Sequence, residues 1–489
     1  MIHELKASER ITTSAIGDFC PYWTILDEKV MVADTAEEII SIFPEKKRII
    51  DPVAVIGLLH FNYIPGNRTL IQGVQRMPWR ATLRGDGFIK RHAPIPHANN
   101  YVGYREIAQN LQELLEEELY NAIQGYRRVF LLLSGGLDSR IIAGVIKKIE
   151  PQLNAQITCI SWGFLNSRDV VYARKIAGWY NWGFFHIPYD CKLTWDNIKR
   201  GAVWGGSEVA GFNLHGLSWF RNAKPEDLVI SGSFGNSLGR AEYNHRHLND
   251  IKIEALSRNR MGLLHPSLPN GLVALIENDR QTAWEGTQRE PDWVLNELNE
   301  QENYLRRELC HPKNYIRNFC NLYEAYTNNK VVSYIWSISP ECRKKEVYYQ
   351  LLKNLDSKLY SLPYARTGVA PDGTRELDLS LRVRYHEWWK WLRCELRPRL
   401  EPLFFSSGLR KLNLFYGLNM HLIWKKWLKE PMNKPGWGLI IAEICSIELS
   451  RQHFNIQPCS IKIYRRDIIA DVFKRGLKKT RNCFLKTFK

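Results

Sequence analysis

The chain has 489 residues, 45% of them hydrophobic and 12% aromatic, a composition that excludes a disordered protein. Its 68 basic and 51 acidic side chains give a formal net charge of +17, which would attract a polyanion whatever the fold. Ten scattered cysteines form no C-x-x-C pair, and the first 19 residues lack the apolar stretch of a signal peptide, so we expect a cytoplasmic protein without a zinc or disulfide framework. No apolar run approaches the ~20 residues that span a bilayer.

The N-terminal part of the chain is predicted as short strands and turns. In residues 23–40 two extended runs flank the break Asp27-Glu28 and lead into a helix. Residues 51–79 contain a short helix, a Pro-Gly-Asn turn and a further extended run. In residues 105–126 apolar side chains recur every three or four positions, which indicates an amphipathic helix.

Strands and helices then alternate along the chain, which predicts a doubly wound parallel α/β sheet. The predicted strands are residues 129–133, 155–164, 184–190 and 227–235. The predicted helices are residues 140–148 and 167–182, the second with Ser167 as its N-cap. Beyond about residue 300 we expect mostly helices, in residues 317–338, 346–355 and 385–404.

The strongest chemical signal is the turn Ser134-Gly135-Gly136-Leu137-Asp138-Ser139, which lies between the strand 129–133 and the helix 140–148. Glycines at such a turn let backbone N–H groups approach an anion, and the helix N-terminus adds roughly half a positive charge. The two serine hydroxyls supply donors, and Asp138 can hold Mg²⁺ on the phosphates. The spacing matches neither the Walker pattern nor G-x-G-x-x-G.

This turn resembles the pyrophosphate loop of the N-type ATP pyrophosphatases, which split ATP into AMP and pyrophosphate while adenylating a substrate. Other segments resemble the asparagine synthetases. Residues 51–79 resemble the end of their glutaminase domain, and residues 161–177 resemble the second strand and helix of their synthetase domain. Residues 231–239 stand where the family has an S-G-E-G-x-D-E loop, and residues 344–371 resemble the C-terminal lobe. The resemblance runs from about residue 20 to about residue 375.

The resemblance implies an adenine nucleotide α-hydrolase-like sheet, a helical C-terminal lobe and a small β-rich N-terminal remnant. On this basis residues 1–103 are a truncated glutaminase-like region, and residues 104–375 are an ATP-pyrophosphatase synthetase domain. Residues 376–489 are a helical C-terminal extension with a basic tail.

The resemblance also assigns site residues and implies ATP and Mg²⁺ as cofactors. The residues that would bind pyrophosphate and Mg²⁺ are Ser134, Gly135, Gly136, Asp138 and Ser139. Leu133 and Trp162 would lie near the adenosine, and Ser231 and Gly232 beside the ribose or the acyl-adenylate. Arg366 stands where the family usually has a catalytic Lys; its charge would stabilise the α-phosphate and the acyl-adenylate, although Arg hardly serves as a base.

Three departures from the family pattern bear on activity. Asn236 replaces a metal-binding Asp and Ser233 replaces a Glu, so that Mg²⁺ would be held with less negative charge and Asn236 would be a weak ligand. A working glutaminase needs an N-terminal Cys, but residue 2 is Ile2, and the internal Cys20 is expected to be core packing. With only about 100 residues before the synthetase domain, the glutaminase is incomplete, and we expect ammonia or an amine to come from solution or from a separate glutaminase.

Three further features allow more than one interpretation. Residues 465–489 carry +7 of the net charge with apolar residues at roughly helical spacing, as in a helix on an anionic membrane surface, a solvated tail or a helix packed on the body. The Trp-rich segment 385–393 could stack on a sugar or a base, but it also fits ordinary helix packing. His186 and His215 each stand alone among apolar residues and are expected to be structural.

Taken together, these features predict an asparagine-synthetase-like, ATP-dependent amide ligase. It would adenylate aspartate or, as the resemblance favours, a uronic acid of a surface polysaccharide, and transfer ammonia or an amine to it, in the cytoplasm and peripherally at the inner face of the membrane if the basic tail binds lipid. A peptide macrolactam cyclase of the same family and a catalytically weakened scaffold are the alternatives. RNA modification ranks last, because only the net charge suggests a nucleic-acid partner.

Overall fold

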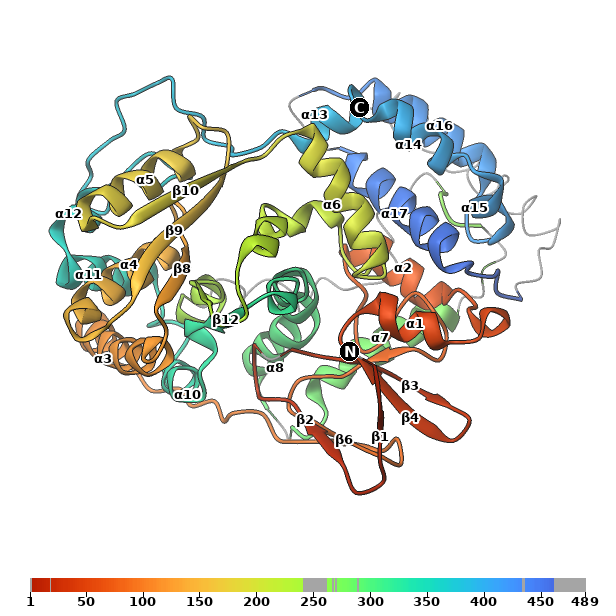
Figure 1. Cartoon of the computed structure of the whole chain (residues 1–489), viewed down its shortest axis with the longest axis horizontal. Coiled ribbons are helices and arrows are strands. Elements are labelled where there is room, and N and C mark those ends of the chain that lie inside the picture. The colour runs from red at the N-terminus through yellow and green to blue at the C-terminus, as the bar shows by residue number, and fades with distance from the viewer. Residues whose placement is uncertain are drawn as a thin grey trace, which may run out of the picture.

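The computed structural model describes residues 2–17, 19–240, 262–265, 268, 271–287, 290–432 and 436–460. Its central element is a five-stranded sheet in which all neighbouring strands are parallel, in the order β10-β9-β8-β11-β12. The strands are β8 (Arg128–Leu132), β9 (Gln156–Gly163), β10 (Gly183–Pro188), β11 (Leu228–Ser231) and β12 (Asn321–Glu324). This sheet confirms the predicted parallel α/β fold (Figure 1).

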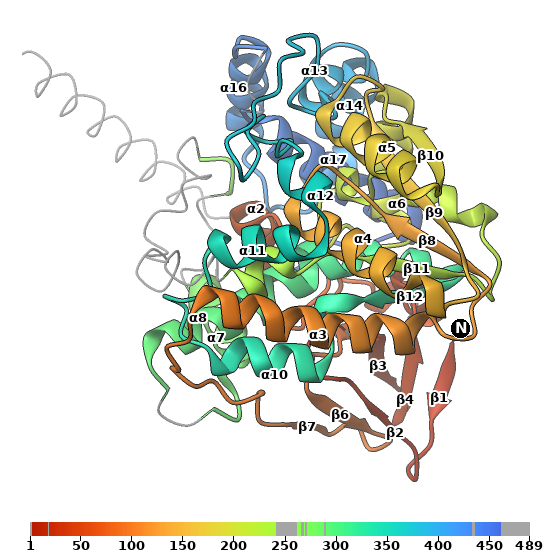
Figure 2. The same cartoon turned by 90° about the vertical axis from the view of Figure 1, so that its left-hand side faces the viewer.

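The two faces of the sheet enter different hydrophobic clusters because side chains alternate along each strand. On β8, Val129 and Leu131 point into the cluster formed with the helices of one face, whereas Phe130 and Leu132 point into a smaller cluster on the other face. Figure 2 looks onto the first layer of helices. This layer contains α3 (Tyr104–Ile123), α4 (Leu137–Ile149), α5 (Arg168–Tyr180), α10 (Asn329–Ser337), α11 (Lys345–Leu355) and α12 (Ser357–Ser361).

The opposite face is covered by α6 (Cys191–Val203), by the short turns that follow it and by the segment 311–320. That segment begins with the short α9 (His311–Lys313), which directly follows an eleven-residue π-helix, η9 (Glu300–Cys310). The helices α7 (Gly271–Gln281) and α8 (Asp292–Asn299) precede it.

The segment 317–338, expected to be mostly helical, contains α10, as predicted, but it also contains the edge strand β12, for which the prediction is wrong. The strand has only four residues, and its partner β11 lies about 90 residues earlier in the chain. Its pairing therefore depends on tertiary contacts that local periodicity does not record.

The first hundred residues form two small antiparallel sheets and two helices, in agreement with the predicted short strands. One sheet has the order β1-β4-β3-β5 and the other β2-β6-β7. The elements are β1 (His3–Leu5), β2 (Arg10–Thr12), β3 (Tyr22–Leu26), β4 (Lys29–Ala33), α1 (Ala36–Ile42), α2 (Pro52–Phe61), β5 (Gln75–Arg76), β6 (Ala81–Arg84) and β7 (Ile89–Arg91). The break Asp27-Glu28 is a hairpin turn with both residues in the left-handed region, as the right-handed twist of the flanking strands requires.

The C-terminal helices share a hydrophobic cluster with α1 and α2. They are α13 (Trp388–Arg393), α14 (Arg397–Phe404), α15 (Ser407–Lys411), α16 (Gly417–Leu428) and α17 (Gly438–Phe454). Trp388 and Trp389 are buried in this cluster, which favours helix packing for the Trp-rich segment. Among the described residues no helix has the length and apolar character needed to cross a bilayer. The basic segment 465–489 lies outside the described residues.

A buried carboxylate joins three distant parts of the chain. Arg76 and Arg307 place guanidinium nitrogens 3.0 and 2.5 Å from Oε2 of Glu208, and all three side chains are inaccessible to solvent. Burial alone would raise the pKa of Glu208, but the two arginines more than offset it and lower the pKa to about 2. The same Arg76 contacts Nδ1 of His311 at 2.8 Å.

Burial also keeps three histidines neutral at ordinary pH. It lowers the pKa of His215 and His311 to about 3 and that of His386 to about 4, from 6.5 in an unfolded chain. The unfolded chain therefore takes up protons that the folded chain does not as the pH falls below 6.5.

We expect stability to be greatest above pH 6.5 and to fall on acidification. With three such groups, the free energy of unfolding should decrease by up to about 4 kcal/mol per pH unit below the unfolded-state pKa. Urea denaturation at pH 7.5 and 5.0 measures this, and His386→Phe should reduce the difference by about a third. Equal midpoints at the two pH values would contradict the assignment of neutral histidines.

Candidate functional site

The candidate site lies where the strand order reverses. From β8 the chain moves outward to β9 and β10, and it returns on the other side of β8 as β11. The turn after β8 and the turn after β11 therefore lie at the same edge of the sheet, and the chain leaves them in opposite directions. α/β proteins bind ligands at such a point.

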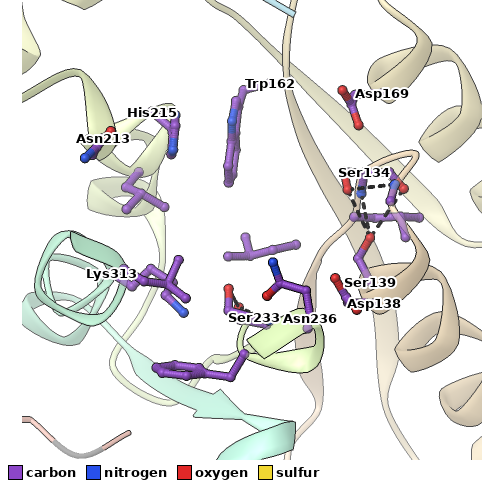
Figure 3. Close-up of a pocket in the computed structure, with 18 of the residues that line it drawn as sticks. Ser134, Asp138, Ser139, Trp162, Asp169, Asn213, His215, Ser233, Asn236 and Lys313 are labelled. Atoms are coloured by element: carbon purple, nitrogen blue, oxygen red, sulfur yellow. Dashed lines mark hydrogen bonds between the residues drawn. The ribbon is translucent and has the colours of Figure 1, made fainter. Parts of the chain in front are cut away.

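The turn after β8 is held by its own polar groups. The backbone N–H of Ser134 donates to Oγ of Ser139 (3.2 Å), the two Oγ atoms are 3.1 Å apart, and the N–H of Gly136 donates to Oγ of Ser134 (3.1 Å; Figure 3). Helix α4 begins directly afterwards, with Gly136 at the N-cap and no side-chain capping bond. Its first-turn N–H groups are thus suited to an anionic ligand.

The turn after β11 lies against the first turn at van der Waals distance. A Cβ on Gly232 would be 2.9 Å from Cα and N of Ser139, and a Cβ on Gly235 would be 2.7 Å from Oδ1 of Asp138. Only glycine permits this approach, because atoms at that distance would have to shift. The hydroxyl of Ser231 donates to Oγ of Ser233 (2.8 Å) and accepts from its N–H (3.2 Å).

The two turns enclose a cavity of about 550 Å³. Of the residues predicted from the sequence, those that line it are Leu133, Ser134, Gly136, Asp138, Ser139, Trp162, Ser231, Gly232, Ser233 and Asn236. Gly135 does not line it: its N–H donates to Oδ1 of Asp169 (3.0 Å), and a Cβ there would be 2.6 Å from that of Ala365.

Arg366 does not line this cavity either. It is exposed and faces a neighbouring cavity of about 500 Å³, which shares Gly136, Asp169 and Tyr385 with the first. The cation that lines the first cavity is Lys313, at the end of α9. Its side chain is 8% exposed, and its ammonium pairs with the buried Glu324 at the end of β12 and lies 4.9 Å from the ring centroid of Phe234.

Lys313 belongs to a wall of the cavity that sequence reasoning did not identify. This facing wall consists of Asn213, His215, Tyr304, Glu308 and Lys313. In Figure 3 its labelled members Asn213, His215 and Lys313 lie across the cavity from Ser134 and Asp138. The amide of Asn213 donates to Oε1 of Glu308 (2.9 Å).

The winding of η9 explains why the facing wall was missed. In a π-helix hydrogen bonds run from residue i to i+5, so side chains four or five positions apart share a face. Tyr304 and Glu308 lie four positions apart on η9, Lys313 follows five positions later in α9, and all three line the cavity. A search for the α-helical period groups Tyr304 with Glu308 but does not add Lys313.

His215 was expected to be structural, but it lines the cavity. Its backbone is also strained. Its φ of +43° and ψ of −130° are unusual for a residue with a Cβ. Its ring stacks on Trp162, with centroids 5.4 Å apart and planes inclined by 10°. Its Nδ1 is buried without a hydrogen-bond partner among the described residues.

The carboxylates at the first turn differ in their surroundings. Oδ2 of Asp138 lies 3.5 Å from a guanidinium nitrogen of Arg240. Burial raises the pKa of Asp169, although the N–H of Gly135 and the charge of Arg140 act in the opposite direction. No group of three or more His, Cys, Asp or Glu residues within the described ranges could hold a metal ion. Asp138 and Asn236 can therefore fit Mg²⁺ only together with phosphate oxygens, which is the usual manner for this ion.

Comparison with known proteins adds to this geometry. Residues 110–192 match the sequence model of the asparagine synthase family. The chain is 34% identical over 228 residues to the glutamine-hydrolyzing asparagine synthetase of Gallus gallus, a match that covers 44% of this chain and 38% of the relative. The chain thus spans less than two fifths of that relative.

Two solved structures show a partial likeness. The NMN synthetase of Francisella tularensis is 15% identical, with 29% of this chain and 59% of that chain covered and a TM-score of 0.20. The NH3-dependent NAD synthetase of Campylobacter jejuni is 16% identical, with 39% and 99% covered and a TM-score of 0.19. The family match includes the turn 134–139 between β8 and α4, and the chain accordingly contains a domain of the asparagine synthase family.

Proposed function

We propose that this chain is an ATP-dependent amide ligase that adenylates a carboxylate and transfers ammonia or an amine to it. The observation that carries the proposal is the pair of touching glycine turns, 134–139 and 231–236, around one cavity at the reversal of strand order. The N-terminus of α4, which has no side-chain cap, and the hydroxyls of Ser134 and Ser139 suit a polyphosphate. Leu133 and Trp162 offer the apolar surface that an adenosine needs.

The reaction has two steps. A carboxylate oxygen bonds to the α-phosphorus of ATP while the bond from that phosphorus to the bridging oxygen breaks, and its electron pair leaves with pyrophosphate. The amine nitrogen then bonds to the acyl carbon, the bond to AMP breaks, and the nitrogen loses a proton. The protein contributes by orienting the reactants and by stabilising charge on the phosphates.

Asp138 and Asn236 would hold Mg²⁺, which would supply positive charge to the phosphates when bound. Arg366 faces the neighbouring cavity, and its action on the α-phosphate and the acyl-adenylate stays a prediction. The acyl substrate would be aspartate or a uronic acid, and the nitrogen would come from solution or from a separate glutaminase. The division into residues 1–103, 104–375 and 376–489 and the contact of the basic tail with an anionic membrane stay predictions.

A catalytically weakened scaffold is the second candidate, and one observation favours it. Arg240 already neutralises Asp138 at 3.5 Å, and neither Ser233 nor Asn236 adds a carboxylate. ATP with Mg²⁺ must compete with that ion pair. A protein that binds Mg·ATP without carboxylate-dependent exchange of pyrophosphate would support the scaffold.

Asp138→Asn tests the ligase. We expect it to lower carboxylate-dependent ATP–pyrophosphate exchange by ~100-fold or more, because it removes the charge that would hold Mg²⁺ on the phosphates. The matched control is Asp86→Asn, an exposed residue paired with Arg84, which should leave exchange intact. Exchange in Asp138→Asn at the wild-type rate would exclude the proposed role.

Gly232→Ala tests the contact between the two turns. Its Cβ, 2.9 Å from the backbone of Ser139, should force the turns apart, destabilise the fold by about 1–3 kcal/mol and reduce exchange more than tenfold. Gly178→Ala in α5 is the control, since its Cβ would meet no atom within 4 Å. That variant should gain about 0.5–1 kcal/mol and keep its activity. Thermal unfolding and exchange assays compare the two, and equal behaviour would contradict the assigned contact.

A further inference from the structure

The facing wall combines two opposite charges that the fold holds in place. Lys313 is fixed from behind by the buried Glu324, and Glu308 is fixed by the amide of Asn213. Both side chains line the cavity. In Figure 3 Lys313 and Asn213, the hydrogen-bond partner of Glu308, lie across the cavity from the turn 134–139. A buried ion pair such as Lys313–Glu324 contributes little net stability, so its presence at a cavity suggests a use other than folding.

Two structural features mark the facing wall as specialised. Tyr304 and Glu308 of this wall lie on η9, an eleven-residue π-helix that leads into the α9 of Lys313, and π-helical turns occur frequently at functional sites. His215, on the same wall, has a backbone conformation that costs free energy, and strained residues of this kind cluster where ligands bind. Strain and unusual winding therefore coincide on one side of the cavity.

Adenylation poses an electrostatic problem that this wall can solve. The carboxylate is an anion that must approach the polyphosphate of ATP, and the two repel each other in a cavity of low dielectric. Neutralisation requires a cation on the side from which the carboxylate arrives. Among the described residues that line the cavity, Lys313 is the lysine or arginine on that side, because Arg366 faces the neighbouring cavity. Glu324 already shares its charge, so that Lys313 offers the carboxylate its N–H donors and the remaining part of that charge.

We propose that the facing wall holds the two organic reactants of the proposed ligase, with Lys313 binding the carboxylate and Glu308 the amine. This assignment rests on the proposed function. The ammonium of Lys313 screens the carboxylate from the phosphates until its oxygen bonds to the α-phosphorus. Glu308 attracts the amine in its protonated form, and its carboxylate accepts the first proton, which frees the lone pair of the nitrogen for attack on the acyl carbon. The second proton, which the nitrogen loses on forming the amide, leaves with the phosphate of AMP or to water.

The assignment describes the substrates by their chemistry. The acyl substrate is a carboxylate that fits beside ATP in a cavity of about 550 Å³, where Leu305 and Leu309 line the wall next to the charged groups. The buried Nδ1 of His215 is suited to hydrogen-bond with a hydroxyl or amine substituent of that substrate. The nitrogen donor is a small amine or ammonia that fits between Glu308 and the acyl carbon.

The two half-reactions separate the two roles, because pyrophosphate exchange needs the carboxylate but no amine. The probes are D-glucuronate and L-aspartate as carboxylates and ammonium chloride as nitrogen source. Lys313→Met should raise the KM for the carboxylate in exchange at least tenfold, while binding of a non-hydrolysable ATP analogue by calorimetry stays within twofold of wild type. Glu308→Gln should raise the KM for ammonium at least tenfold and alter the pH profile of amide formation, with the carboxylate KM in exchange nearly unchanged.

Controls keep the test interpretable if Lys313→Met is unstable, since it leaves Glu324 buried without its cation. Lys313→Met combined with Glu324→Gln removes both charges and should show the same loss. Lys313→Arg should restore part of the carboxylate affinity. Lys330→Met, which removes an exposed lysine paired with Glu117, should behave as wild type.

Each outcome has a distinct meaning. A wild-type protein that exchanges pyrophosphate with neither carboxylate rejects the proposed function, and the assignment of the wall with it. If Lys313→Met and the double variant Lys313→Met with Glu324→Gln both keep the wild-type KM for the carboxylate in exchange, only the role of Lys313 is overturned. An unchanged ammonium KM and pH profile in Glu308→Gln overturns the role of Glu308.

Discussion

The shape of the cavity depends on one buried guanidinium, that of Arg140 in the first turn of α4. It donates to the carbonyl oxygens of Gly135 (3.0 Å), Leu362 (2.6 Å), Pro363 (2.9 Å) and Leu359 (3.2 Å). Burial lowers the pKa of Arg140 to about 10, so it still carries its charge near neutral pH, surrounded by carbonyl dipoles. One side chain thereby ties the turn after β8 to a segment more than 200 residues later, and the second cavity forms along that junction.

One side of the cavity could be predicted from the sequence because its chemistry is local. Ser134, Asp138 and Ser139 lie within six consecutive residues between a strand and a helix, and strand, turn and helix each have their own signal. The second turn could be located by its glycines after an apolar strand. Sheet topology then brings both turns to one edge, which is a general property of parallel strands rather than of these residues.

The facing wall could not be predicted in this way. Lys313 and Glu308 are five positions apart, which on an α-helix separates them by about 140° around the axis. Lys313 lies beyond η9, in α9, and the π-helical winding before it, together with Asn213 beside Glu308, brings both residues to one cavity. Arg366 was placed by its position in the family pattern, and the fold directs it to the adjoining cavity, so that its role stays a prediction. Edge strand β12 was missed for a related reason, since only its pairing with β11 defines it.

Because of the buried ion pairs of Glu208, the parallel sheet depends on the N-terminal region. Arg76 comes from the N-terminal region and Arg307 from η9, so two parts of the chain neutralise one carboxylate in the interior. A fragment limited to the sheet and its helices would keep Glu208 and Arg307 but lose Arg76 and the fully buried Trp79. The small N-terminal sheets therefore supply counter-charge and core to the parallel sheet. We expect a fragment without them to fold poorly, because Glu208 would keep only one of its two buried arginines.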